Sequence, residues 1–153
     1  MPCARTLQVQ GQWQLSVGSN GDQPGEFSFI QCLALTPDEA YLLVVEGRGN
    51  NRLVVLRATD GSWVRHLTGP PNTLDMPHDV AVVLSTGRVL VTNKCYQVVE
   101  FRSIEDDTVT GVLGTGKGDG PTEFHEPYGI VVLDAPYCPP VLSDINDVYV
   151  ASL

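Results

Sequence analysis

Three polar side chains recur at one fixed place along the sequence. Gln31, His78 and Tyr128 each stand four residues after an apolar side chain. These apolar side chains are, in order, Phe27, Leu74 and Phe124. Glutamine, histidine and tyrosine all donate and accept hydrogen bonds, so a fold that placed the three at one level would form a polar surface. No Ser-His-Asp or Cys-His nucleophile set can be assembled around them, which favours binding over catalysis.

His78 could instead act as a metal ligand. A catalytic zinc site needs about three protein ligands. The equivalent positions, Gln31 and Tyr128, supply no suitable replacement, and the remaining histidines, His66 and His125, are expected on an outer strand and in a linker. The sequence therefore predicts no bound metal and no cofactor.

The glycine-rich run GTGKGDG at 114–120 invites comparison with a phosphate-binding loop. A Walker loop requires Ser or Thr after its lysine and a helix behind it. Here Gly118 follows Lys117, and the chain continues into an expected strand. We interpret the run as a linker whose glycines adopt turns with positive φ.

Composition and charge limit the kinds of partner. The 153 residues suit one domain, and 42% hydrophobic with 18% charged residues predicts a folded core. The net charge of -9, from 9 basic and 18 acidic residues, argues against nucleic acid and anionic membranes as partners. The N-terminal residues lack the apolar core of a signal peptide, and no stretch approaches the roughly 18 apolar residues of a membrane span. We therefore expect a cytoplasmic protein.

A repeat organises these residues. The three apolar anchors lie 47 and 50 residues apart, a period near the roughly 40–50 residues of a propeller blade. Between anchors, short apolar runs alternate with turn-forming residues, and each full unit contains four of them. The predicted strands are 31–35, 41–46, 52–57, 62–67, 78–83, 88–92, 97–102, 108–113, 128–133 and 147–151.

Several segments match a known repeat in register. LSVGSNGDQPGEF at 15–27 and GVLGTGKGDGPTEF at 111–124 resemble the linker that opens an NHL repeat. PHDVAVVLSTGRVLVTNKCYQVVEFR at 77–102 resembles the body of one, and Asn50-Asn51-Arg52 matches the usual opening of its third strand. The resemblance implies an all-β protein, a β-propeller of NHL-type four-stranded antiparallel blades.

The resemblance also implies domain boundaries. Over residues 1–153, the outer strands of a preceding blade are expected at about 6–18, and blade units at about 25–67, 72–113 and 122–153. The third unit carries an insertion, 135–146, between its first two strands. A closed propeller needs about four blades, so we expect an incomplete, open ring. The chain would then be a fragment of a longer protein, or its open blade edges would self-associate.

In a propeller the innermost strand of each blade begins near one rim of the central channel. The resemblance therefore places Gln31, His78 and Tyr128 at that rim. The loops between second and third strands return to the same rim and are expected to bring further polar side chains. These are Glu46, Arg48, Asn50, Asn93, Lys94 and Tyr96.

Two classes of function follow. Similar propellers often follow ubiquitin-ligase modules in the same chain and select the partners of those modules. The resemblance therefore implies an interaction module that binds a protein or peptide at the rim and is not itself an enzyme. No RING-type Cys/His cluster is present. The alternative is a propeller enzyme, because Met76-Pro77-His78-Asp79 resembles the metal-ligand stretch of a peptidyl-hydroxyglycine lyase. A lactonase-like hydrolase belongs to the same alternative.

Overall fold

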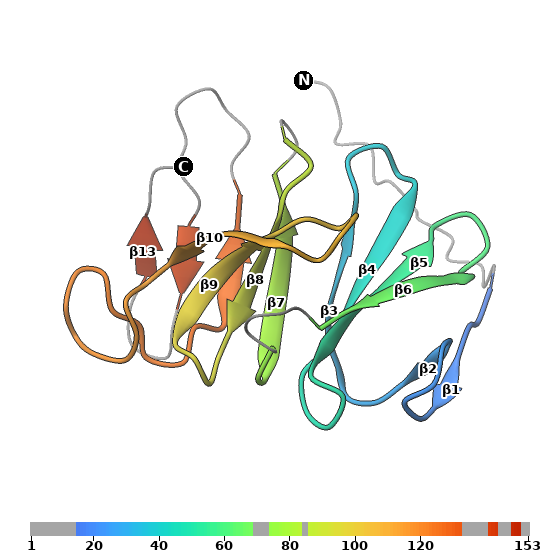
Figure 1. Ribbon diagram of the computed structural model, residues 1–153, viewed down its shortest axis with the longest axis horizontal. Coiled ribbons are helices and arrows are strands. Elements are labelled where there is room, and N and C mark those ends of the chain that lie inside the picture. Colours follow the sequence, from blue (N-terminus) through green and yellow to red (C-terminus); the bar gives the residue numbers. More distant parts are fainter. Residues whose placement is uncertain (1–14, 69–73, 84–85, 133–140, 144–147, 151–153) are drawn as a thin grey trace, which may run out of the picture.

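The computed structural model describes residues 15–68, 74–83, 86–132, 141–143 and 148–150 (Figure 1). Across these ranges the chain contains strands and turns and no helix. The described residues therefore include no helix that could span a membrane. The all-β prediction is confirmed. Most of the strands lie in three sheets, and in every one of these each strand pairs antiparallel with its neighbour in the chain.

The first and second sheets each have four strands. The first sheet comprises β3 (Ile30–Leu35), β4 (Tyr41–Glu46), β5 (Arg52–Arg57) and β6 (Trp63–Leu67). The second comprises β7 (Pro77–Val82), β8 (Val89–Asn93), β9 (Val98–Arg102) and β10 (Val109–Leu113). Each predicted strand of these two units is present, with ends shifted by a residue at most. The third sheet comprises β11 (Gly129–Val131), β12 (Val141–Ser143) and β13 (Val148–Val150).

The third sheet corrects one prediction. The segment 135–146 was expected to be an insertion between the first two strands, yet β12 lies within it and pairs with both β11 and β13. The strand predicted at 147–151 is therefore the third strand of this sheet. Strand β12 contains only two apolar residues, Val141 and Leu142, and follows Pro139-Pro140. Prolines usually mark a loop because they cannot donate to a ladder.

The chain ahead of the first sheet forms a small parallel pair, β1 (Ser19–Asn20) with β2 (Glu26–Phe27). The outer strands predicted at about 6–18 fall largely outside the described ranges, and their described part, 15–18, is not strand. The same arrangement recurs at 117–124, where Lys117 and Phe124 form a parallel bridge. The repeat therefore extends to the linkers as well as the sheets.

A glycine beneath each anchor phenylalanine explains the glycine-rich linkers. Gly18 and Gly114 have φ of 90° and 98°. A Cβ on Gly18 would lie 2.3 Å from the ring of Phe27, and one on Gly114 would lie 2.7 Å from the ring of Phe124. Only glycine combines this backbone conformation with so close a ring. Within the run 114–120, Gly114 and Gly116 have the positive φ expected of linker glycines, whereas Gly118 and Gly120 do not.

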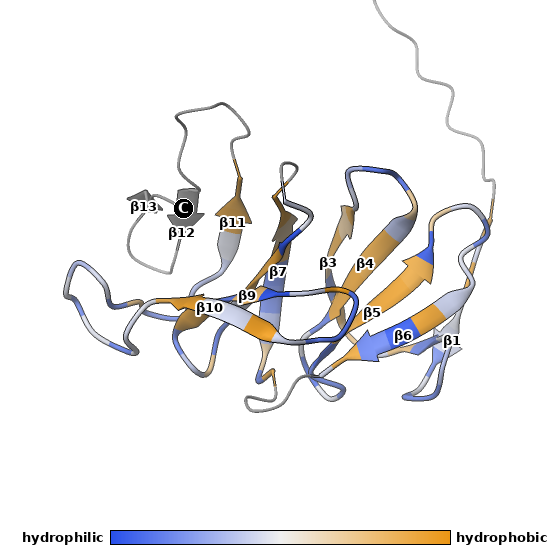
Figure 2. Ribbon diagram, turned by 45° about the horizontal axis from the view of Figure 1, so that its top comes forward, coloured by the Kyte–Doolittle hydropathy of each residue, from blue (hydrophilic) through white to orange (hydrophobic). Residues whose placement is uncertain are grey.

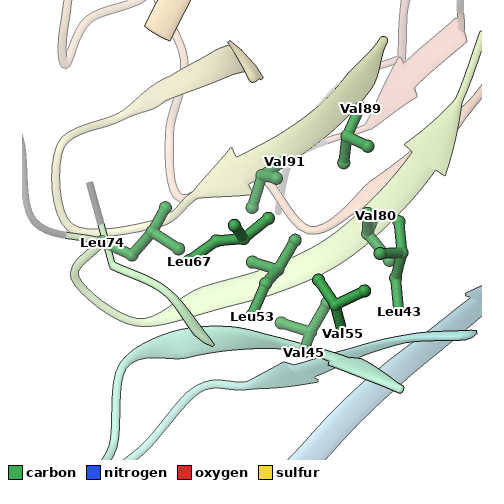
Figure 3. Packing of buried hydrophobic residues seen from close by; sticks show 9 residues of the cluster. All are labelled: Leu43, Val45, Leu53, Val55, Leu67, Leu74, Val80, Val89 and Val91. Carbon is green, nitrogen blue, oxygen red and sulfur yellow. The ribbon is translucent and has the colours of Figure 1, made fainter. Parts of the chain in front are cut away.

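Apolar side chains between neighbouring sheets form the core. The first strands of the sheets lie side by side, with β7 between β3 and β11 (Figure 1). Strands β4 and β5 are hydrophobic over most of their length, whereas β6 alternates (Figure 2). The core between the first and second sheets is shown in Figure 3 and comprises Leu43, Val45, Leu53, Val55, Leu67, Leu74, Val80, Val89 and Val91. A second core, between the second and third sheets, contains Val83, Leu90, Val99, Phe124 and Ile130.

A buried ionic network lies in the second sheet. The side chains of Glu100 and Arg102 are almost fully buried and paired, with 2.5 Å between Nη2 and Oε2. Arg102 Nη1 also donates to Asp107 Oδ1 at 2.7 Å, and Asn93 Nδ2 donates to Glu100 Oε1 at 2.8 Å. The other carboxylate oxygen of Asp107, Oδ2, accepts from the backbone N–H of Thr68 at 2.8 Å. The network thereby ties the end of the first sheet to the second.

The first sheet has a related network around Glu46 and Arg52. Arg52 Nε donates to Glu46 Oε2 at 2.6 Å. The guanidinium also donates to the backbone oxygens of Asp22 and Glu26, at 2.6 and 3.1 Å, and to Nδ1 of His66 at 3.2 Å. These bonds fasten the β1–β2 segment to the sheet. Burial, followed by the charge of Arg52, lowers the pKa of His66, so its ring stays neutral beside the guanidinium.

We predict that removing one member of the charged pair in the second sheet destabilises the protein more than replacing both members with apolar residues. Counted from the last residue pair of each ladder, Glu100 and Arg102 occupy the positions that Val54 and Leu56 hold in the first sheet. Glu100→Ala leaves the buried guanidinium short of an anion and should lower the free energy of unfolding by about 3 kcal/mol or more. The double variant Glu100→Val with Arg102→Leu should lose clearly less. Urea denaturation followed by circular dichroism measures both.

The control for this comparison is Glu105→Ala, which removes an exposed carboxylate nearby and should change the unfolding free energy by no more than about 0.5 kcal/mol. A double variant at least as unstable as Glu100→Ala would show that the ion pair is not replaceable by apolar packing.

We also predict self-association through β3. Leu33 and Leu35 point away from the core and are 56% and 47% exposed, whereas Cys32 and Ala34 pack against it. Exposed apolar side chains on a sheet promote association. Leu33→Lys with Leu35→Thr should lower the mean mass seen by light scattering at micromolar concentration. The control Thr110→Lys adds the same charge on β10 and should leave the mean mass unchanged. Equal masses for the wild type and the double variant would contradict the prediction.

Candidate functional site

A pocket forms where the three sheets begin. It has a volume of about 220 Å³. Its lining residues are Phe29, Gln31, Gly47, Arg48, Met76, Pro77, His78, Lys94 and Tyr128. Five of the nine side chains that the sequence predicts for one rim therefore line a single pocket, namely Gln31, Arg48, His78, Lys94 and Tyr128.

The topology explains why residues far apart in sequence meet. Gln31 and His78 lie in β3 and β7, and Tyr128 directly precedes β11. Because β7 packs between β3 and β11, the beginnings of these strands are neighbours. Antiparallel pairing returns the end of each second strand to the same level, which brings in Arg48 after β4 and Lys94 after β8.

A second pocket of about 330 Å³ adjoins the first. It shares Gln31, His78 and Tyr128 with the first pocket and adds the next residue of each strand, namely Cys32, Asp79 and Gly129. The hollow therefore follows the first strands of the sheets. Burial, followed by a hydrogen bond to Asp79, raises the pKa of the Cys32 thiol, so this thiol is protonated at neutral pH.

Tyr128 contacts two other lining residues, His78 and Lys94. Its ring meets that of His78 edge to face, with 4.3 Å between centroids and 71° between planes. Its backbone oxygen lies 3.2 Å from His78 Nδ1. Lys94 Nζ donates to its hydroxyl at 2.9 Å and to Glu126 Oε2 at 2.9 Å. The Tyr128 hydroxyl, and after it Glu126, raises the pKa of Lys94.

Three residues at the start of the sheets share an unusual backbone conformation. Phe29, Met76 and Glu126 have φ of 50°, 51° and 52°, and each stands two residues before a predicted site residue. Bulky side chains seldom adopt this left-handed conformation, which costs of order 1–3 kcal/mol. Phe29 and Met76 line the pocket. Sequence patterns did not reveal them, because glycine is the residue normally associated with such a φ.

Side chains of the preceding sheet hold two of these residues in place. The backbone N–H of Met76 donates to Asn51 Oδ1 at 3.2 Å, and that of Glu126 donates to Gln97 Oε1 at 2.6 Å. Asn51 and Gln97 each directly precede the third strand of their sheet. Each sheet therefore positions the entry to the next one.

The close approach of strands at the pocket also requires a glycine. A Cβ on Gly47 would lie 2.8 Å from Cγ of Gln31 and 2.8 Å from the backbone oxygen of Pro77. Both neighbours line the pocket, so a larger residue here would push its walls apart. Gly47 is a further site residue that the strand pattern alone did not indicate.

The other predicted rim residues lie elsewhere. Asn50 Nδ2 donates to Glu46 Oε1 at 2.8 Å and to the backbone oxygen of Gly21 at 2.9 Å, so its amide belongs to the ionic network of the first sheet. Glu46 and Asn93 are buried within the two networks. Tyr96 is 48% exposed and lines neither pocket. Within the described ranges, no group of three His, Cys, Asp or Glu side chains could hold a metal ion.

The charge of the pocket differs from that of the chain. Two cations, Arg48 and Lys94, line the first pocket, and no carboxylate does, although acidic residues outnumber basic ones by 18 to 9 overall. Lys94 is ion-paired. Arg48 is exposed and makes no hydrogen bond or ion pair with any described residue. Its donors are therefore available to a ligand.

Comparison with models of known protein families gives no match for this sequence, and comparison with curated protein sequences gives no significant match either.

We predict that Lys94 is chemically less reactive than the only other lysine, Lys117, which is exposed in a linker. At about pH 9, below the ordinary lysine pKa of about 10.4, the raised pKa of Lys94 leaves less of its reactive neutral amine. Mass spectrometry after brief acylation should show slower labelling of Lys94. Tyr128→Phe with Glu126→Gln should narrow the difference while leaving Lys117 unchanged; an unaltered ratio would contradict the assigned cause.

Proposed function

We propose that this chain is a protein-interaction module that binds a protein or peptide segment at the pocket shared by its three sheets. The observation that carries the proposal is the repetition at this pocket. Each of three consecutive sheets contributes the residue at the same repeat position, Gln31, His78 or Tyr128. Two loops add charged side chains beside them. Loops on a rigid scaffold are the usual place for recognition.

An incomplete β-propeller of NHL-type blades is the architecture that we propose for it. Four-stranded antiparallel sheets whose first strands lie side by side are what such blades would provide, and the recurring linkers support the comparison. In this proposal the pocket belongs to the rim of the channel. The chain would be part of a larger repeat protein, such as the substrate-selecting part of a ubiquitin-ligase-type protein.

Exposed residues at the edge of the pocket favour a peptide over a free small molecule, because pockets for drug-sized ligands enclose most of the ligand. Arg48 and Phe29 are both exposed lining residues, so a ligand that contacts them would lie partly on the surrounding surface. Phe29, 65% exposed at its edge, offers an aromatic contact of the kind enriched at interfaces.

The proposal predicts that Arg48 and Tyr128 dominate binding. Peptides selected from a display library with the purified protein provide the ligand, and fluorescence anisotropy provides the affinity. Arg48→Ala with Tyr128→Ala should weaken binding about 30-fold or more, because truncation of such contacts often loses about 2 kcal/mol or more. Circular dichroism should show an intact fold.

The matched control is Arg88→Ala with Tyr96→Ala, which removes the same residue types at exposed positions outside both pockets. It should leave affinity within about twofold, since contacts outside the centre of an interface add little. A library that yields no binding peptide, or equal losses in the two double variants, would refute the proposed function.

A further inference from the structure

The pocket combines apolar lining residues with Arg48, a cation that has no partner among the described residues. Arg48 and Lys94 are two of nine cations in a chain of net charge -9, yet both line the first pocket, whose described lining contains no carboxylate. The carboxylate of Asp79 lines the adjoining second pocket. Charge complementarity favours an anionic group on the ligand and disfavours cationic ones. The acidic surface elsewhere leaves this hollow as a local exception.

Arg48 is the group that would bind the anion. Its guanidinium is exposed and has no partner among the described residues. The planar fork of an arginine matches a carboxylate with two parallel hydrogen bonds. Lys94 differs because Glu126 already neutralises it at 2.9 Å. Glu126 therefore competes with an incoming anion for Lys94. Removal of the Glu126 carboxylate would make the ammonium group of Lys94 available to that anion.

His78 and Gln31 can bind the peptide backbone beside the anion. The Tyr128 backbone oxygen 3.2 Å from His78 Nδ1 only accepts, so Nδ1 carries the hydrogen of this contact and Nε2 has no part in it. The Gln31 amide both donates and accepts. Both side chains can therefore add directional hydrogen bonds to a ligand.

Phe29, Met76 and Pro77 form the apolar part of the lining. Phe29 is 65% exposed, and both Phe29 and Met76 hold the strained left-handed conformation. Strain of this kind persists at ligand-binding sites where the surroundings enforce it. A thioether and an aromatic ring adapt readily to an apolar side chain.

We propose that the ligand of this pocket is a carboxylate-bearing peptide segment, in which an acidic group binds Arg48 and an adjacent apolar side chain packs against Phe29 and Met76. The proposal rests on the proposed function and deepens it. The carboxylate can come from an aspartate or glutamate side chain or from the C-terminus of the partner chain.

The test uses two peptide display libraries with the purified full chain, one with blocked C-termini and one with free C-termini. Selected peptides from the blocked library should carry Asp or Glu next to an apolar residue if side chains supply the carboxylate. Enrichment confined to the free library identifies the C-terminus as the source. In synthetic peptides, exchanging the selected Asp for Asn, or amidating the C-terminus, should weaken binding about tenfold or more, because a charge-assisted pair is lost.

Variants of the chain then identify the groups responsible. Arg48→Gln should abolish the preference for the acidic peptide over its neutral counterpart, while weak binding to the apolar part remains. Glu126→Gln releases Lys94 and should tighten binding of the acidic peptide about threefold. Arg88→Gln removes an exposed arginine outside the pocket and should change neither affinity nor preference.

The outcomes separate this inference from the proposed function. Selected peptides without an acidic group, or an Asp-over-Asn preference that survives Arg48→Gln, overturn the inference and leave a peptide-binding module standing. Failure of both libraries refutes the proposed function itself. Binding of short single-stranded RNA in preference to the selected acidic peptide also overturns the inference, since phosphate would then be the preferred anion.

Discussion

The relation between consecutive sheets depends on one hydrogen bond that recurs along the chain. A side-chain amide at the entry to the third strand of one sheet accepts from the backbone N–H of a left-handed residue ahead of the next sheet. Asn51 does this for Met76, and Gln97 does it for Glu126. The left-handed residue sets the direction in which the chain enters the first strand of the next sheet. These bonds therefore fix where neighbouring first strands begin, and with them the residues that line the pocket.

Buried charge stabilises the same connections from inside. Linker backbone groups that leave water need partners, and two nearly buried arginine–carboxylate pairs, Arg52 with Glu46 and Arg102 with Glu100, stand at the centre of networks that provide them. The two pairs occupy different positions in their ladders, although both connect a neighbouring segment to a sheet. Consecutive repeats therefore use residues at different positions for a similar structural role, so the architecture is kept while the sequence varies.

The strand order and the residues that meet at the pocket were predictable because they depend on spacing alone. Gln31, His78 and Tyr128 come together since equal offsets from Phe27, Leu74 and Phe124 become equal positions in neighbouring sheets. Other features depend on contacts that spacing does not encode. The amide of Asn50 could equally well face a ligand or Glu46, and only packing decides. The three residues of β12 follow a proline pair, and the positive φ of Met76 has no signature in residue type.

The local topology has a consequence for how the molecule folds and opens. Every strand of the three sheets pairs with a strand adjacent in the chain, so the partners in each ladder lie close together in sequence. Contacts between sheets join residues about one repeat apart in sequence. In repeat proteins of this kind the free energy of unfolding is approximately a sum of the stability of each repeat and of the interfaces between neighbouring repeats. The second sheet has a neighbour on each side, so we expect it to open last. Hydrogen exchange would then proceed from the two outer sheets inward, and the amides of β8 and β9 would be the last to exchange.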